Sequence, residues 1–166
     1  MSASILVFRP AELADFAALH AMYNAAGRWL HDSKGITDQW DRDIADEEVL
    51  RFIASGQATV AVWEEEPAGA LRLAEKASLP WKDEGDDALY LHELVVRRDL
   101  AGRRLGRQIG AGAAAETRRR GRRYLRLECM AANPRLCQYY AEAGFSPRGQ
   151  HPHYTWYALF EQDVRA

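Results

Sequence analysis

The sequence predicts a mixed α/β or α+β fold built on a single sheet. Short β-branched runs alternate with segments of helical periodicity along the whole chain, and a hairpin signal lies in the first half. In the second half, Gly121 and Gly144 follow amphipathic segments, as glycines that end helices do. The length of 166 residues suits one domain, which we expect to span 1–166.

The first half of the chain should supply one strand, two helices and a hairpin. Pro10 stands where a proline favours the first turn of a helix, and the helical pattern weakens at Gly27. Asp41 or Asp43 could cap the second helix. The predicted elements are a strand over 4–9, a helix from 10 to about 27, a helix from 41 or 43 to 54, and hairpin strands over 57–63 and 70–75 around a turn at 64–69.

The second half should alternate strands and helices. Asn133 followed by Pro134 has the form of a helix cap with a proline at the first helical position. The predicted elements are an acidic loop over 78–87, a central strand over 89–96, a helix over 103–120, a strand over 124–129, a helix over 134–143 and a final strand over 154–160.

Composition and charge exclude several classes of function. With 48% hydrophobic and 28% charged residues and a net charge of −2, the chain is typical of a soluble globule with no global field for nucleic acid. A nucleic-acid binder using the basic run 118–123 stays an alternative, although cations are also favoured at a helix C-terminus. No run approaches the ~20 apolar residues of a membrane helix. Cys129 and Cys137 lie in apolar patterns, which indicates buried thiols, no metal site and a cytoplasmic protein.

The stretch from Tyr90 to Ile109 has the features of an anion-binding loop. A β-branched strand ends at Val96, a short polar turn follows, and glycines and arginines then open a helix. Backbone N–H groups at a helix start point toward a bound anion, and glycines let the backbone approach it closely. Five arginines between Arg97 and Arg107 add charge suited to phosphate oxygens.

Two motifs in the chain resemble those of the GCN5-related N-acetyltransferase (GNAT) superfamily. The segment Ala101-Gly-Arg-Arg-Leu-Gly106 resembles its coenzyme A loop, Gln/Arg-x-x-Gly-x-Gly/Ala, with departures at Ala101 and Arg104. The segment from Asn133 to Phe145 resembles its Asn-x-x-Ala-x-x-x-Tyr-x-x-x-Gly-Phe motif, with Leu136 in place of alanine. The resemblance implies a single mixed, mostly antiparallel sheet of six to seven strands flanked by about four helices.

The resemblance also implies a function and a coenzyme site. The expected activity is acetyl-CoA-dependent N-acetyl transfer, made directly to a primary amine of a small molecule or peptide, with acetyl-CoA as the acyl donor and no metal. The alternative is a catalytically weak acyl-CoA-binding sensor of the same fold. The coenzyme-binding residues implied by the match are Leu94, Val95, Val96, Ala101, Gly102, Arg103, Arg104, Leu105, Gly106, Arg107, Asn133 and Tyr140.

Two residues are expected to move protons. An alkylammonium, with a pKa of ~10, must lose a proton before it attacks, and the departing thiolate benefits from gaining one. The family match places Tyr140 as the acid toward sulfur, with its neighbour Tyr139 as the fallback. It makes His92 the leading base, with ordered water as the alternative. Strand alternation puts His92 on the face of Tyr90, Leu94 and Val96, and Glu93 on the opposite face.

The acceptor site is less defined by the sequence than the coenzyme site. The first two helices and the central strand should line it, with four residues as candidates for contact: Trp40, Arg72, Trp81 and Tyr90. The expected partners are coenzyme A and an amine, without nucleic acid or membrane. The identity of the amine, the length of the acyl chain and the oligomeric state, a homodimer included, stay open.

Overall fold

The structure, a computed structural model, describes residues 5–81, 85 and 87–166. The chain divides into two compact units. Unit 1 comprises residues 1–72 and 93–109, and unit 2 comprises residues 73–92 and 110–166. The acidic loop expected over 78–87 lies partly outside the described residues, at positions 82–84 and 86.

Seven strands form one sheet in the order β1-β2-β3-β4-β5-β7-β6. The strands are β1 (Val7–Pro10), β2 (Ala58–Trp63), β3 (Glu66–Ala74), β4 (Ala88–Val96), β5 (Tyr124–Met130), β6 (Ser146–Gln150) and β7 (Tyr157–Asp163). The β4–β5 pair is parallel, whereas β1–β2, β2–β3, β5–β7 and β6–β7 are antiparallel. The predicted single, mixed and mostly antiparallel sheet is therefore confirmed.

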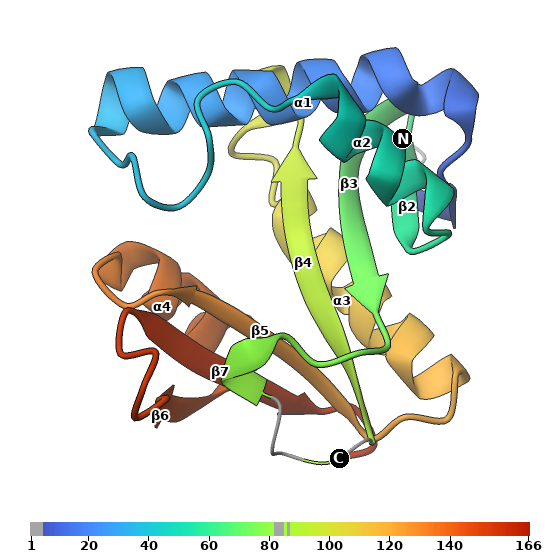
Figure 1. The fold of residues 1–166 in the computed structure, drawn as a ribbon. Helices are drawn as coiled ribbons and strands as arrows, with labels where there is room; N and C mark the ends of the chain where they lie inside the picture. Colours follow the sequence, from blue (N-terminus) through green and yellow to red (C-terminus); the bar gives the residue numbers. More distant parts are fainter. Residues whose placement is uncertain (1–4, 82–84, 86) are drawn as a thin grey trace. The chain divides into compact units, whose positions relative to one another are not determined.

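Unit 1 is organised around the helices α1 (Phe16–Arg28) and α2 (Asp46–Ala54), which Figure 1 shows beside β2 and β3. An amphipathic helix is stabilised mainly by burying its apolar face, and both helices do so here. Their buried side chains join strand residues in one cluster: Leu19, Met22, Tyr23, Val49, Phe52, Ala58, Val60, Ala70 and Val95.

The prediction that Pro10 opens the first helix was wrong. Pro10 is the last residue of β1, an edge strand, where its missing N–H costs no ladder hydrogen bond. The helix is entered through a 3-10 turn at Leu13–Asp15. Asp15 accepts a hydrogen bond from the Glu12 amide at 2.8 Å and a bidentate pair from Arg9, so an Asp rather than the proline begins the helical path.

Gly27 does not break the first helix as the sequence suggested. It lies inside α1, and a π-helical turn at Trp29–Ser33 prolongs the helical path. A Cβ atom at Gly27 would lie 2.3 Å from the backbone oxygen of Asp41, so this glycine allows the α1–α2 connection to approach the helix. Asp43, one of the two expected caps of α2, instead pairs with Arg28, and α2 begins only at Asp46.

The hairpin turn is shorter than predicted. The expected turn over 64–69 and strand over 70–75 are replaced by a two-residue turn at Glu64 and Glu65, with β3 starting at Glu66. Both turn residues have positive φ, at 52° and 66°, as a type I′ turn requires. Pro67 was taken as a turn signal, but it lies within β3 opposite Val62, next to a register shift between Ala61 and Val62.

Unit 2 contains most of α3 (Leu105–Arg119) and all of α4 (Pro134–Glu142), together with β5, β6 and β7 (Figure 1). The local helix signals are confirmed here. The Asn133 side chain accepts a hydrogen bond from the Leu136 amide at 3.1 Å, and Pro134 is the first helical residue. Gly121 and Gly144 follow the two helices with φ of 75° and 97°. The final strand lies at 157–163, three residues later than predicted.

Candidate functional site

In unit 1, the loop between β4 and α3 holds two residues in the left-handed region. A 3-10 turn at Arg98–Leu100 follows β4, Gly102 has a φ of 85° and Arg104 a φ of 60°, and α3 begins at Leu105. Arg104 therefore occupies a conformation that favours glycine, which explains why the family pattern has glycine at this position. Its left-handed backbone turns the chain into the first turn of the helix.

Apolar side chains before and after the exposed part of the loop anchor it within unit 1. Leu100 and Leu105 are buried against Ala68 and Val96. The Arg97 amide donates to the Ala68 carbonyl at 2.8 Å just after β4 ends. Between these anchors, residues 101–104 are exposed, so the segment expected to hold a diphosphate presents its backbone to solvent on a fixed base.

Three of the arginines in the basic segment already have partners. The guanidinium of Arg98 lies 3.9 Å from the centroid of the Trp29 ring, and that of Arg103 lies 5.0 Å from the Trp63 ring. Arg97 pairs with Asp99 at 2.8 Å. These contacts stiffen the loop, because a stacked guanidinium loses conformational freedom while keeping N–H groups at its edge for an anion.

The amides at the start of α3 complete an anion-binding geometry. The first intrahelical hydrogen bond runs from the Gln108 amide to the Arg104 carbonyl at 3.3 Å. The amides that precede Gln108 in the helix lie before this ladder, as the first N–H groups of any α-helix do. The exposed loop, its two left-handed residues and this helix start fit a diphosphate group.

The end of β4 in unit 1 is irregular at Glu93. This residue has a φ of 47°, and the Tyr23 hydroxyl donates to its carbonyl at 2.8 Å. Burial raises the pKa of Tyr23 far above its usual value, which keeps this hydroxyl a donor. A residue in the left-handed region interrupts strict alternation, so the expected sharing of one face by His92 and Val96 stays a prediction.

The Glu93 side chain is held by Arg72 of β3. Arg72 donates to the two carboxylate oxygens at 2.7 and 3.3 Å, donates to Gln57 at 2.8 Å, and lies 5.5 Å from the Phe52 ring centroid. The pair borders a cavity of about 270 Å³ in unit 1. Arg72 was an expected acceptor-site residue, and Glu93, which strand alternation placed on the face opposite His92, lines the same cavity.

In unit 2, Tyr140 lies on α4 within a group of aromatic rings. Its ring contacts those of Tyr139, Phe145 and Phe160, with centroids 5.3–5.9 Å away. Burial raises the pKa of the Tyr140 hydroxyl above its ordinary value, with smaller contributions from Cys129 and Tyr139. A phenol in this setting keeps its proton at neutral pH, which is the protonation state that an acid toward a thiolate requires.

Two free thiols lie close to this tyrosine-bearing helix. The Sγ atoms of Cys129 on β5 and Cys137 on α4 are 3.8 Å apart. Burial, with smaller contributions from the nearby Cys137, raises the pKa of the Cys129 thiol to about 12. Since the thiolate is the reactive form, Cys129 is unsuited to be a nucleophile.

His92 of β4 pairs with a glutamate of β5 within unit 2. Its Nδ1 lies 3.8 Å from Glu128 Oε1, and both side chains are largely buried. The second carboxylate oxygen, Oε2 of Glu128, is buried without a hydrogen-bond partner. The pair places a carboxylate within ion-pair distance of the imidazole of His92. A charged residue within an apolar strand was the available signal for Glu128, and the sequence reasoning did not use it.

The other expected acceptor-site residues differ in burial: Trp81 and Tyr90 are buried, whereas Trp40 is partly exposed. Trp81 and Tyr90 are almost fully buried in unit 2, where the Tyr90 hydroxyl contacts Arg126 at 3.3 Å. Trp40 in unit 1 packs with its edge against Tyr23, and its carbonyl contacts His31 Nε2 at 2.6 Å. Trp81 and Tyr90 therefore offer almost no surface to a ligand, contrary to what their expected role requires.

Two further findings concern the described part of the chain. None of its helices has both the length and the apolar content needed to cross a bilayer. Residues 5–81, 85 and 87–166 also contain no group of three or more His, Cys, Asp or Glu side chains placed to hold a metal ion.

Comparisons with known proteins identify the family of the chain. A family model described as "Acetyltransferase (GNAT) family" matches residues 16–145. The Uncharacterized N-acetyltransferase YesJ of Bacillus subtilis (strain 168) is 28% identical, over 95% of this chain and 89% of its own length. A GNAT-family acetyltransferase from Listeria monocytogenes superposes with a TM-score of 0.79 at 24% identity, covering 95% of this chain and 94% of its own.

A third similar protein was solved with a coenzyme. The yncA protein of Salmonella typhimurium, in a structure with its cofactor acetyl-CoA, superposes with a TM-score of 0.68 at 20% identity. The alignment covers 97% of this chain and 95% of that one. At such identities the two structural matches establish the fold, and the family match rests on the sequence model.

Proposed function

The chain belongs to the acetyltransferase (GNAT) family, and on that premise we propose that it transfers an acetyl group from acetyl-CoA directly to a primary amine. The observation that carries the proposal is the loop of unit 1 in which Gly102 and Arg104 adopt left-handed conformations before α3. This backbone provides the anion site that a diphosphate of coenzyme A needs. The acetyl-CoA found with the similar yncA protein supports the choice of donor.

Main-chain groups of unit 1 would hold the donor. Residues 101–107 take the diphosphate, with Arg103 and Arg107 adding charge at the helix start. Strand β4 pairs with β5 over Ala88–Tyr90 and runs on to Val96. We assign the strand edge at Leu94–Val96 to the pantetheine arm, which would bind as an added strand does, with one amide polarising the acyl carbonyl.

Residues of unit 2 would move the protons. Acetyl-CoA supplies an acyl thioester; in the reaction the C–S bond breaks and a C–N bond forms. The ammonium nitrogen loses two protons, of which sulfur gains one and the base passes the other to solvent. We assign the proton from the amine to His92, directly or through water, with Glu128 orienting the imidazole. Tyr140 holds the proton for sulfur, and Asn133 caps α4 and contributes to coenzyme binding from the same helix.

Replacing Tyr140 by Phe tests the assigned acid. Loss of the hydroxyl should lower kcat by roughly 100-fold, the scale of general acid catalysis, while changing the Kd for acetyl-CoA by less than about threefold. Release of free thiol from acetyl-CoA against a panel of amines measures turnover, and calorimetry measures the affinity. Tyr139→Phe is the matched control, because it removes the hydroxyl of the adjacent tyrosine on the same helix.

The alternative function, a sensor that binds acyl-CoA without transferring the acyl group, makes a different prediction. It predicts thermal stabilisation by acetyl-CoA without thiol release for any amine. An unchanged kcat in the Tyr140→Phe variant would remove Tyr140 from the mechanism while leaving acetyl transfer in place. Failure of acetyl-CoA to bind at all would overturn both functions, since both depend on the loop at 101–107.

A further inference from the structure

The cavity in unit 1 is small and opens at the residue before the proposed donor strand edge. Its volume is about 270 Å³, below the range of roughly 300–1,000 Å³ that accommodates drug-sized ligands. Helix α2, its C-cap and strands β3 and β4 supply the lining residues: Glu48, Arg51, Phe52, Ser55, Arg72 and Glu93. Glu93 directly precedes Leu94, so a molecule bound here would lie next to the donor.

The charges that line the cavity balance. Two carboxylates, of Glu48 and Glu93, face it together with the guanidiniums of Arg51 and Arg72. Arg72 is held by Glu93, by Gln57 and by the Phe52 ring, so its position is fixed. The Arg51 side chain is 72% exposed and lies 3.6 Å from Glu48, beyond hydrogen-bonding distance. Arg51 therefore has guanidinium donors available to an anionic ligand.

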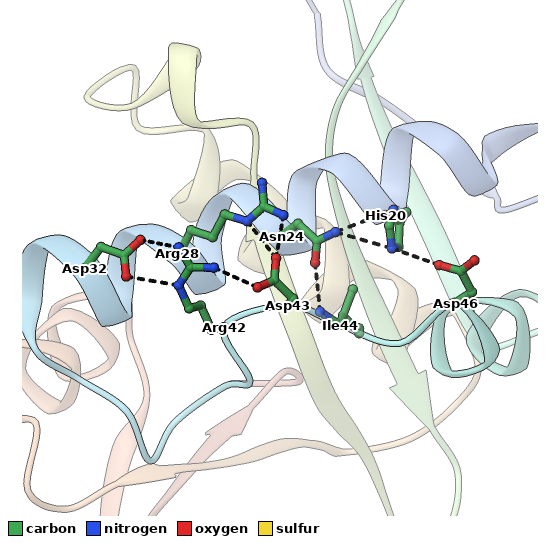
Figure 2. Close-up of polar contacts among 8 residues, drawn as sticks. All are labelled: His20, Asn24, Arg28, Asp32, Arg42, Asp43, Ile44 and Asp46. Atoms are coloured by element: carbon green, nitrogen blue, oxygen red, sulfur yellow. Dashed lines mark hydrogen bonds and ion pairs between the residues drawn. The ribbon is translucent and has the colours of Figure 1, made fainter.

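Two other acidic residues near α2, Asp43 and Asp46, have partners outside the cavity. Figure 2 shows Asp43 accepting hydrogen bonds from Arg28 at 2.6 Å and from Arg42 at 2.8 Å. Asp46, at the start of α2, lies 3.0 Å from His20 Nε2. Asp43 is thus paired with two guanidiniums, and neither Asp43 nor Asp46 is among the residues that line the cavity.

From these charges and this volume we infer that the acceptor is a small α-amino acid, a class that extends the function proposed above and rests on it. The amine group binds between Glu48 and Glu93, and the carboxylate binds to Arg51 and to the N–H groups of Arg72 not used by Glu93 and Gln57. A ligand carrying both charges satisfies both pairs. A simple alkylamine leaves the guanidinium donors without an anion, and a polyamine exceeds the two carboxylates and the volume.

Matched pairs of substrates test the inference. Each L-α-amino acid, from alanine to phenylalanine, is compared with the amine that remains after removal of its carboxylate, and spermidine represents polycations. Thiol release from acetyl-CoA should show kcat/KM at least about tenfold higher for the best amino acid than for its decarboxylated partner, as loss of a charged hydrogen bond implies. Spermidine should be a poorer substrate than that amino acid.

The Arg51→Gln variant then tests whether Arg51 binds the carboxylate of the substrate. It should raise KM for the best amino acid about tenfold, leave its kcat within about twofold, and leave the decarboxylated amine unaffected. Arg119→Gln is the matched control, because Arg119 is also on a helix, is 73% exposed and pairs with the glutamate three residues earlier, Glu116. It should change neither substrate.

The outcomes separate this inference from the proposed function. If the decarboxylated amines or spermidine react as well as the amino acids, the inference is overturned and the acetyltransferase function stands. If no amine releases thiol, the acetyltransferase function falls, and calorimetric titration of the same amino acids into the wild-type and Arg51→Gln proteins decides the rest. Binding that Arg51→Gln abolishes supports the amino-acid site, and no binding overturns it.

Discussion

An ion pair in unit 1 and an ion pair in unit 2 differ in how far they are exposed to water. In unit 1 the pair Arg72–Glu93 is partly open to water, with side-chain exposures of 22% and 26%, and it borders a cavity. In unit 2 the pair Arg126–Glu161 is 4% and 11% exposed, and the guanidinium also lies 5.1 Å from the Trp81 ring centroid. Both pairs have the same 2.7 Å contact between Nε and a carboxylate oxygen.

The difference teaches that contact distance does not reveal what an ion pair is for. A charge that is nearly dry must stay paired, because desolvation makes an unpaired charge costly. Burial alone would lower the pKa of Arg126, yet the hydrogen bond from Arg126 to Glu161 keeps it above its usual value, so the pair stays charged. A half-exposed pair can exchange its partner for a ligand. The unit 2 pair is therefore structural, whereas the unit 1 pair can take part in binding.

The largest expected effect on stability comes from removing the buried ion pair Arg126–Glu161. Glu161→Gln leaves Arg126 charged and buried without its counter-ion and should lower the free energy of unfolding by about 3 kcal/mol or more. Glu93→Gln removes a charge of the same kind where solvent screens the loss, and should cost less than about 1 kcal/mol. Urea unfolding of both variants measures the contrast, and equal losses would refute the distinction drawn between the units.

The next effect sharpens the comparison at the chemical step. His92 lies in unit 2 and Glu93 in unit 1, although they are neighbours in sequence. His92→Gln should lower kcat by roughly 100-fold, because it removes the assigned base. Glu93→Gln should mainly raise KM for the acceptor, because it removes a carboxylate that binds the amine. The pH dependence of kcat and kcat/KM for both variants separates the two roles.

The opposite result would reassign the base. If Glu93→Gln lowers kcat while His92→Gln changes it by less than about threefold, then Glu93 accepts the proton and the His92–Glu128 pair is structural. A loss of kcat in neither variant would leave ordered water as the acceptor of the proton, the alternative that the sequence already allowed.

The order of elements could be predicted because its signals are local. The glycines after α3 and α4 and the Asn133 cap act within one turn of helix, and all three are where the sequence placed them. The errors came from residues whose role depends on a distant partner. Gly27 alone suggests a helix break, but its actual role is to make room for the backbone at Asp41, which the sequence does not show to be a neighbour. Pro10 alone suggests the start of a helix, but in the structure it ends β1, which is an edge strand.

In the candidate site, too, local features could be predicted from the sequence and distant partners could not. The loop at 101–107 could be found from the spacing of its glycines and arginines. Arg104, which stands where the family pattern has glycine, has a left-handed conformation that favours glycine. The partners of Arg72 and His92 could not be found, because Glu93 and Glu128 lie 21 and 36 residues away in the sequence. The periodicity of a single strand or helix gives no information on pairs between residues so far apart in sequence.

The last expected effect concerns Asp15, a buried carboxylate at the helix entry of unit 1. Hydrogen bonds from Arg9 hold the pKa of Asp15 below its usual value. A lowered pKa contributes stability above the unfolded pKa of ~3.9, and this contribution is lost as the pH falls through the folded pKa. Asp15→Asn should therefore cost about 1 kcal/mol at pH 7, at the low end for a helix cap because Arg9 is partly exposed.

The same carboxylate gives a test of how far solvent screens unit 1. The difference in unfolding free energy between the wild type and Asp15→Asn should be constant from pH 6 to 8 and shrink below about pH 4, where the wild-type carboxylate gains a proton. Urea unfolding at pH 7 and pH 3 measures it. A loss at pH 7 as large as that of Glu161→Gln would show that Arg9–Asp15 behaves as a dry pair, and the contrast between the units would then not extend to the helix entry.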